Sequence, residues 1–260
     1  MESLLNVTDS QTNDFADDQA TADRAIAAIR IMAAALDKIA EAGPAQPQAP
    51  TSTQRAFLLA YGWFAAIVRT GELIALGHEN GLRHECAPSA RMVLHHTLAL
   101  QWLIEGGESA VDALQADAER RSYDLVKELK ETKWPIPAGF TMHAQTKPAK
   151  SGALEEQVDN FKAMCQLYKG GDQLYVPFKL QSGYVHPSWV GAQAYLIPEE
   201  GALSPTAVTD TNAHLVDTAR SVILAGHAFA LLLNDPFLAN EVANAEGTLG
   251  MPFALWQRLK

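Results

Sequence analysis

One apolar segment, PSARMVLHHTLALQWLIE from Pro88 to Glu105, carries most of the side chains that could do chemistry. Its periodicity predicts a helix, in which positions i, i+4, i+7, i+11 and i+14 share one face. That face holds Arg91, His95, Leu98, Trp102 and Glu105. Because a buried, unpaired charge is strongly unfavourable, Arg91 must either meet acidic partners in the core or line a cavity.

Both interpretations of Arg91 stay open at the level of the sequence. In the structural one, the guanidinium pairs with Glu72 or Glu105 in a buried network. In the functional one, the face of Arg91 lines a polar pocket within a helical bundle. Neighbouring residues on a helix lie about 100° apart, so His95 and His96 cannot both point inward.

Two arginine–histidine spacings stand out in the predicted helices. Arg91 and His96 form an R-x4-H pair, and Arg220 and His227 form an R-x6-H pair. These spacings resemble the signature of HEPN domains, helical bundles found in many bacterial toxins and defence proteins. The resemblance implies a metal-independent ribonuclease whose composite site lies at a dimer interface. Arg91 would bind phosphate and His96 would be the acid/base.

A later element, SGYVHPSW, adds a second resemblance. Together with SARMVLHHTLALQWLI it is similar to a bacterial family of unknown function, which has a buried arginine-bearing helix and a late Ser-x-x-x-His element. The matching positions are Arg91, Ser182, His186 and Pro187. That family often has an acidic residue one turn after the arginine, where this chain has histidines. We expect Tyr184 and His186 either to join His95 in the pocket or to form a packed corner.

Metal and phosphate-loop motifs are missing from the sequence. No H-E-x-x-H motif and no pair of E-x-x-H helices occurs, and these are the usual spacings of zinc and di-iron sites. No G-x-x-x-x-G-K-S/T or G-x-G-x-x-G loop is present either. We therefore expect no metal and no other cofactor.

The composition limits the partners and the compartment. The chain has 260 residues, a net charge of −10 and two cysteines, so broad DNA binding and a disulfide framework are disfavoured. The N-terminus lacks the basic start of a signal peptide. The most apolar stretches, 56–68 and 222–233, are shorter than the roughly 20 residues that span a bilayer. We expect a cytoplasmic protein without membrane contact.

Proline and glycine divide the chain into helical blocks with few β signals. This pattern predicts an all-α bundle of about seven or eight helices, in a single domain with irregular loops. Gly106 and Gly107 separate the helix of Arg91 from an amphipathic one that begins at Glu108, and a long irregular connection follows at 134–152. The expected organisation is an N-terminal helix at 1–42, a proline-rich linker at 43–52 and a helical bundle domain at 53–260.

Two classes of function are compatible with these patterns. The first is the HEPN-like ribonuclease or toxin of a bacterial defence system, acting on RNA as a homodimer through Arg91 and His96. The second is a non-catalytic helical module that binds a small molecule or a protein partner beside the same helix. In both classes the binding residues would be His95, Trp102, Glu105, Tyr184, His186 and Glu72.

Overall fold

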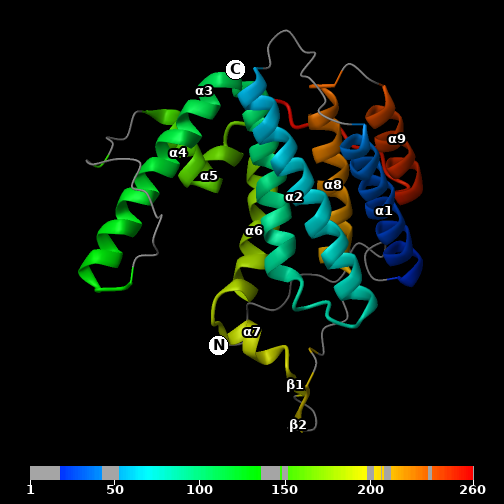
Figure 1. Cartoon of the computed structure of the whole chain (residues 1–260). Coiled ribbons are helices and arrows are strands. Elements are labelled where there is room, and N and C mark those ends of the chain that lie inside the picture. Colours follow the sequence, from blue (N-terminus) through cyan, green and yellow to red (C-terminus); the bar gives the residue numbers. More distant parts are fainter. Residues whose placement is uncertain are drawn as a thin grey trace.

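The computed structural model describes residues 18–42, 53–135, 147, 152–197, 202–205, 207, 212–233 and 236–259. These residues form nine helices and one two-stranded hairpin (Figure 1). The predicted all-α class is therefore confirmed. Three of the helices have seven residues or fewer. The linker expected at 43–52 and most of the connection at 134–152 lie outside the described residues.

Six longer helices build the body of the molecule: α1 (Gln19–Glu41), α2 (Gln54–Glu79), α3 (Ala87–Glu131), α6 (Gly171–Val185), α8 (Ala213–Ala230) and α9 (Phe237–Leu249). The short helices are α4 (Ala153–Asp159), α5 (Phe161–Cys165) and α7 (Trp189–Gln193). Strands β1 (Leu196–Ile197) and β2 (Ala202–Leu203) pair antiparallel, with Leu196 opposite Leu203.

The core lies where α1, α2, α8, α9 and the first half of α3 meet. The N-terminal helix α1 packs against α2, α8 and α9 and buries its whole apolar stripe, so it belongs to this core. Gly226 of α8 permits the close packing, because a Cβ there would lie 2.5 Å from Met32 Cε of α1 and 2.7 Å from Val242 Cγ2 of α9.

Helix α3 changes direction at Gly107, where the sequence predicts a break. Gly107 has φ 53° and ψ −135°, a conformation that residues with a Cβ rarely adopt. The first half of α3 runs along α2, α6 and α8, and the second half leaves the bundle as an arm accompanied by α4 (Figure 1). The kink therefore creates a concave region between the arm and the body.

A buried charge network fastens α4 to the arm. Arg120 of α3 contacts Glu155 of α4 and donates to Asp117 Oδ1 at 3.1 Å. The side chains of Arg120 and Glu155 are 6% and 1% exposed, so both charges depend on this pairing. The network holds the outer wall of the concave region in place.

Helix α2 is the one described helix that is long and apolar enough to cross a membrane, with a mean hydropathy of 1.3 over its most apolar window. Core helices of soluble proteins reach the same values. In this structure one face of α2 packs on α1, α3 and α8, and its outer face exposes Leu58, Leu73 and Leu76.

After α9 the chain runs as an irregular tail along the body. Lys169 N donates to Gln257 O at 2.8 Å, and Leu259 N donates to Leu167 O at 2.8 Å. The side chain of Gln101 forms two hydrogen bonds with the backbone of Trp256. It donates to the carbonyl oxygen at 2.7 Å and accepts from the amide at 3.2 Å. These bonds fix the position of Trp256.

Candidate functional site

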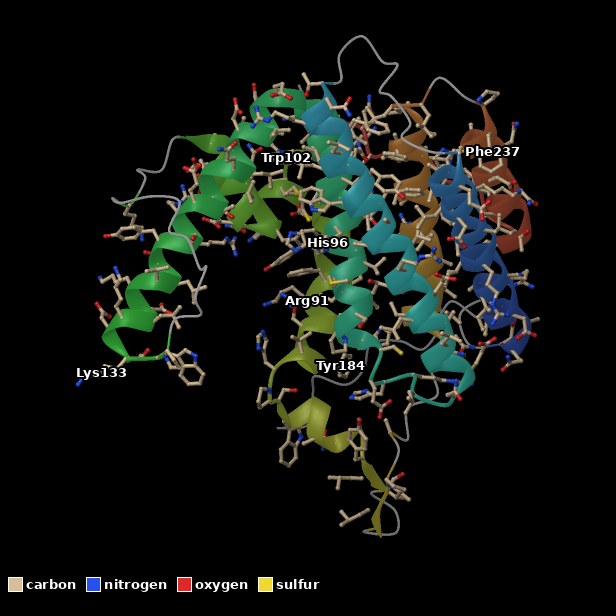
Figure 2. All side chains as sticks on the ribbon, in the orientation of Figure 1. Arg91, His96, Trp102, Lys133, Tyr184 and Phe237 are labelled. Carbon is tan, nitrogen blue, oxygen red and sulfur yellow. The ribbon has the colours of Figure 1, made fainter. Side chains whose placement is uncertain are left out.

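A cavity of about 320 Å³ lies between the body and the arm. Helix α2 contributes one residue, α3 contributes residues from both sides of its kink, and α4 and α5 close the outer wall. The lining consists of Trp63, His95, His96, Ala99, Trp102, Leu114, Arg121, Val158 and Met164. We call it the histidine cavity. Of the predicted site residues, it brings together His95, His96 and Trp102 (Figure 2 labels His96 and Trp102). The expectation that His95 and His96 cannot both point inward is therefore wrong, because the cavity is wide enough to be lined by adjacent positions of one helix.

His95 lies among aromatic rings. Its imidazole packs edge-on against Phe161 at a centroid distance of 4.8 Å and against Phe178 at 6.0 Å. Burial, with smaller contributions from His96 and Arg91, lowers the pKa of His95 from 6.5 to about 4. The ring is therefore neutral near pH 7, with one N–H donor and one acceptor nitrogen.

His96 is oriented by its own helix. Its Nδ1 lies 2.9 Å from the carbonyl oxygen of Met92, and because a carbonyl can only accept, Nδ1 carries the hydrogen. In the neutral ring Nε2 then holds the free lone pair. The ring also meets the indole of Trp63 edge-on at 6.2 Å, so α2 and α3 together position it.

Trp102 and Arg121 complete the polar groups of the lining. Trp102 is fully buried, and its Nε1 donates to Gln157 Oε1 at 2.8 Å. Arg121 donates to Asp117 Oδ2 at 2.6 Å and to Asp159 Oδ1 at 2.9 Å. Two carboxylates thus compensate the only permanent charge of this lining.

Arg91 lies outside the histidine cavity, over the ring of Phe178 at 4.2 Å from the guanidinium carbon to the ring centroid. Its Nε is buried without a hydrogen bond. Arg91 is half-buried, and no carboxylate in the described part of the chain forms an ion pair with it, so the interpretation that pairs it with Glu72 or Glu105 is wrong; the ring of Phe178 stabilises the guanidinium instead.

The two acids expected near Arg91 have other partners. Glu72 binds Arg69 of its own helix at 2.7 Å. Glu105 accepts from Gln101 at 2.7 Å and from the Tyr168 hydroxyl at 2.9 Å, and it pairs with Arg258 at 3.4 Å. Glu105 therefore ties the tail to the body, and neither acid lines the cavity.

Tyr184 and His186 do not join His95. The ring of Tyr184 lies edge-on to His84 at 4.8 Å and to His214 at 5.8 Å, below the level of Arg91 in Figure 2. His186 follows the end of α6 and is exposed. Tyr184 therefore packs against histidines of other segments, whereas the exposed His186 fits neither of the two interpretations.

The other arginine–histidine spacing is separated from the first. Arg220 lies over the ring of Phe253 at 5.8 Å, and His227 Nε2 contacts Glu246 Oε1 at 2.8 Å. Arg220 and His227 line neither wall of the histidine cavity.

Much of the lining could not be predicted from the sequence. Trp63 could have been identified from the sequence, because it is a large aromatic residue within an apolar helical segment. Arg121, Leu114, Val158 and Met164 reach the cavity only because α3 bends and α4 and α5 fold back onto it. No local spacing reports that contact.

The chain matches no known family of proteins, no curated protein and no solved structure. The chemistry of the site must therefore be argued from its own geometry. Within the described residues, no three His, Cys, Asp or Glu side chains are grouped to hold a metal ion. What the cavity offers is aromatic surface and two imidazoles.

Proposed function

We propose that this protein binds a small, neutral, aromatic molecule in the histidine cavity. The observation that carries the proposal is the lining, in which two indoles and two imidazoles stand among apolar side chains. Ligand pockets are typically concave, mostly apolar and about 300–1,000 Å³, with few polar groups. A cavity of about 320 Å³ fits the lower end of that range.

The charges of the lining favour a neutral ligand. Arg121 is already held by Asp117 and Asp159, and burial keeps His95 uncharged near pH 7 by lowering its pKa. An anion would therefore find no uncompensated positive charge among the lining residues that the structure describes. A neutral heteroaromatic ring could stack on the partly exposed indole of Trp63 and exchange hydrogen bonds with the imidazoles.

The size of the cavity limits the ligand further. A cavity of about 150 Å³ accommodates benzene, so the histidine cavity has room for a molecule of one or two rings. Indole and benzimidazole are suitable probes, because they have the right size and differ in their hydrogen-bonding nitrogens.

Binding can be measured from the imidazole signals of His95 and His96 by NMR during titration with each probe. We expect saturable shifts in the wild type. The substitution Ala99→Phe places a ring inside the cavity and should abolish them, whereas Ala66→Phe, on the exposed face of α2, should not. If neither probe shifts these signals, or if Ala99→Phe binds equally well, the proposal is wrong.

A second candidate function is the HEPN-like ribonuclease. It is favoured by the orientation of His96, whose Nδ1 donates to the carbonyl of Met92 and leaves Nε2 free to accept a proton. Arg91 precedes it by five positions on the same helix and would bind the phosphate. This candidate also requires a homodimer, which light scattering can measure.

The ribonuclease candidate is tested by incubating the protein with structured RNA in EDTA. Cleavage that His96→Ala and Arg91→Gln abolish, but that His186→Ala retains, would support it. Absence of cleavage by the wild type, or equal cleavage by all variants, would exclude it.

A further inference from the structure

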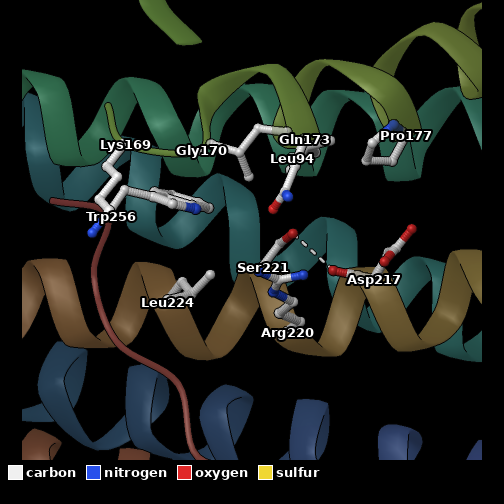
Figure 3. A pocket seen from close by; sticks show the side chains of 11 residues that line it. Leu94, Lys169, Gly170, Gln173, Pro177, Asp217, Arg220, Ser221, Leu224 and Trp256 are labelled. Atoms are coloured by element: carbon white, nitrogen blue, oxygen red, sulfur yellow. Dashed lines mark hydrogen bonds between the residues drawn. The ribbon is translucent and has the colours of Figure 1, made fainter. Parts of the chain in front are cut away.

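A second cavity lies on the opposite side of the α3 and α6 pair, and its lining differs in kind. Its volume is about 170 Å³. Helix α3 contributes Leu94, α6 contributes Gln173 and Pro177, and α8 contributes Asp217 and Arg220 (Figure 3). We call it the aspartate cavity. Lys169, before α6, and Trp256, from the tail, stand together at one end of it (Figure 3).

The carboxylate of Asp217 is the distinctive group of this cavity. It receives no hydrogen bond from any residue that the structure describes, and Ser221 bonds only the main-chain carbonyl of Asp217. Burial raises the pKa of Asp217, and the nearby Arg220 partly offsets that effect. Desolvated carboxylates are normally paired, so an open cavity beside an unpaired one suggests a missing cationic partner.

The two cations of the lining, Arg220 and Lys169, are exposed to solvent. Neither Arg220 nor Lys169 forms an ion pair with a carboxylate in the described ranges of the chain. The guanidinium of Arg220 lies over the ring of Phe253 at 5.8 Å, which leaves its hydrogen-bond donors available. The cavity thus presents the carboxylate of Asp217 near the exposed guanidinium of Arg220, while Lys169 lies at the end away from Asp217 (Figure 3).

The spacing of the opposite charges defines the ligand. Asp217 and Arg220 are three positions apart on α8, and the Cβ atoms of such pairs lie about 5–6 Å from each other. A molecule with an ammonium and a carboxylate on one carbon could engage both side chains at once. The apolar side chains of Leu94, Pro177 and Leu224 would face the remainder of that molecule.

We propose that the aspartate cavity binds a small zwitterionic amino acid with a short aliphatic side chain. The ammonium would donate to Asp217, and the carboxylate would accept from Arg220. Since a cavity of about 150 Å³ holds a six-atom ring, the available 170 Å³ suits an amino acid of the size of alanine or valine. This site is separate from the histidine cavity and does not depend on the function proposed there.

The walls of the aspartate cavity are held before any ligand arrives. Gln101 fixes the backbone of Trp256 through two hydrogen bonds, and Lys169 N bonds Gln257 O at 2.8 Å. Asp217 and Ser221 are one turn apart on α8, whose geometry is set by the core. Pre-organised walls lower the entropic cost of binding.

The test is calorimetric titration of the full chain with L-valine, isobutylamine and isobutyrate, which share an aliphatic group but differ in charge. We expect L-valine to bind at least about tenfold more tightly than either single-charge compound, since each lost charge-assisted contact costs that much or more. No binding of L-valine or L-alanine at millimolar concentration would overturn the proposal. Equal affinity for L-valine and isobutylamine would overturn the assignment of Arg220.

Variants locate the site. Asp217→Asn keeps the shape and removes the charge, so affinity for L-valine should fall at least about tenfold, while Asp112→Asn on the exposed surface should bind as the wild type does. Gln173 is exposed on α6, so Gln173→Trp can narrow the mouth without altering the core and should also weaken binding. Unchanged affinity in folded Asp217→Asn and Gln173→Trp, as judged by thermal melting, would refute the site.

Discussion

The two cavities share a partition but have opposite electrostatic character. Leu94 and Pro177 line the aspartate cavity, while the next residues along the chain, His95 and Phe178, pack against each other on the other side at 6.0 Å. In the histidine cavity the charge of Arg121 is compensated by two carboxylates. In the aspartate cavity the carboxylate of Asp217 receives no hydrogen bond from the described residues, and the cations nearby, Arg220 and Lys169, are exposed to solvent.

This difference shows how one pair of helices can separate two chemistries. Adjacent positions on a helix point about 100° apart, so a step of one residue moves a side chain from one cavity to the other. What distinguishes the cavities is therefore the elements behind them. The arm and α4 bring compensating carboxylates to one, and α8 brings the unpaired carboxylate of Asp217 and the exposed Arg220 to the other.

The largest expected effect is on the free energy of unfolding, and it involves the wall of the histidine cavity alone. Arg120→Met removes the buried ion pair of Glu155, which should lower the free energy of unfolding by about 3–5 kcal/mol and loosen the wall that α4 forms. Denaturant unfolding measures this cost, and probe binding should weaken in the histidine cavity alone. Arg121→Met, whose side chain is 66% exposed, is the control and should cost less than about 1 kcal/mol. Equal costs for both variants would contradict the buried network.

The second effect is a dependence on pH from the histidine cavity. Because the pKa of His95 is about 4 in the folded chain and 6.5 ordinarily, the unfolded chain takes up the proton first as the pH falls. Stability is thus unaffected above pH 6.5 and should fall by about 2–3 kcal/mol on going to pH 4. When urea unfolding is measured across pH, His95→Gln should remove this fall in the free energy of unfolding at acidic pH. The surface substitution His186→Gln should leave the fall in place. If the fall in stability at acidic pH persists in His95→Gln, it is caused by other groups.

The third effect concerns the aspartate cavity. Gln101→Leu removes both hydrogen bonds to the backbone of Trp256, at a cost of about 2 kcal/mol, and should release the tail. Hydrogen exchange of the Trp256 and Lys169 amides should accelerate, and L-valine binding should weaken while indole binding persists. Gln115→Leu, which is exposed on the arm, is the matched control. Unchanged exchange in Gln101→Leu would mean that the tail is held elsewhere.

The smallest effect has the opposite pH sign. Burial raises the pKa of Asp217 above 3.8, so as the pH rises through that value the unfolded chain loses its proton first and stability falls. The loss is complete above the folded pKa and persists at neutral pH. Asp217→Asn should therefore slightly stabilise the protein at pH 7, with thermal melting as the measure and Asp112→Asn as the control. Destabilisation at pH 7 would indicate that a cationic group already pairs with Asp217.

The fold class could be predicted from the sequence because it depends on local patterns. Apolar periodicity gave α1, α2 and α8, and the glycine pair located the bend of α3. The site was predicted only in part, since His95, His96 and Trp102 share one helix. Glu105 contacts Tyr168 and Arg258, which lie 63 and 153 positions further along the chain. No rule based on local spacing predicts contacts over such separations.

Arg91 illustrates the limit of reasoning from charge alone. Desolvation arguments require a partner for a buried guanidinium, and they suggest a carboxylate first. The structure leaves Arg91 half-buried over the face of Phe178, an interaction worth about 0.5–2 kcal/mol, and its buried Nε has no hydrogen bond. Which of these partners a helix will meet depends on the fold of a distant segment.

The bend at Gly107 determines more than the course of α3. Ala99 and Trp102 precede it and Leu114 and Arg121 follow it, so opposing walls of one binding volume belong to a single continuous helix. Any mutation of this codon that changes the amino acid introduces a Cβ, which the local backbone disfavours. The size of ligand that the cavity accepts could then change only through the side chains on either wall, because the angle between the walls stays constant.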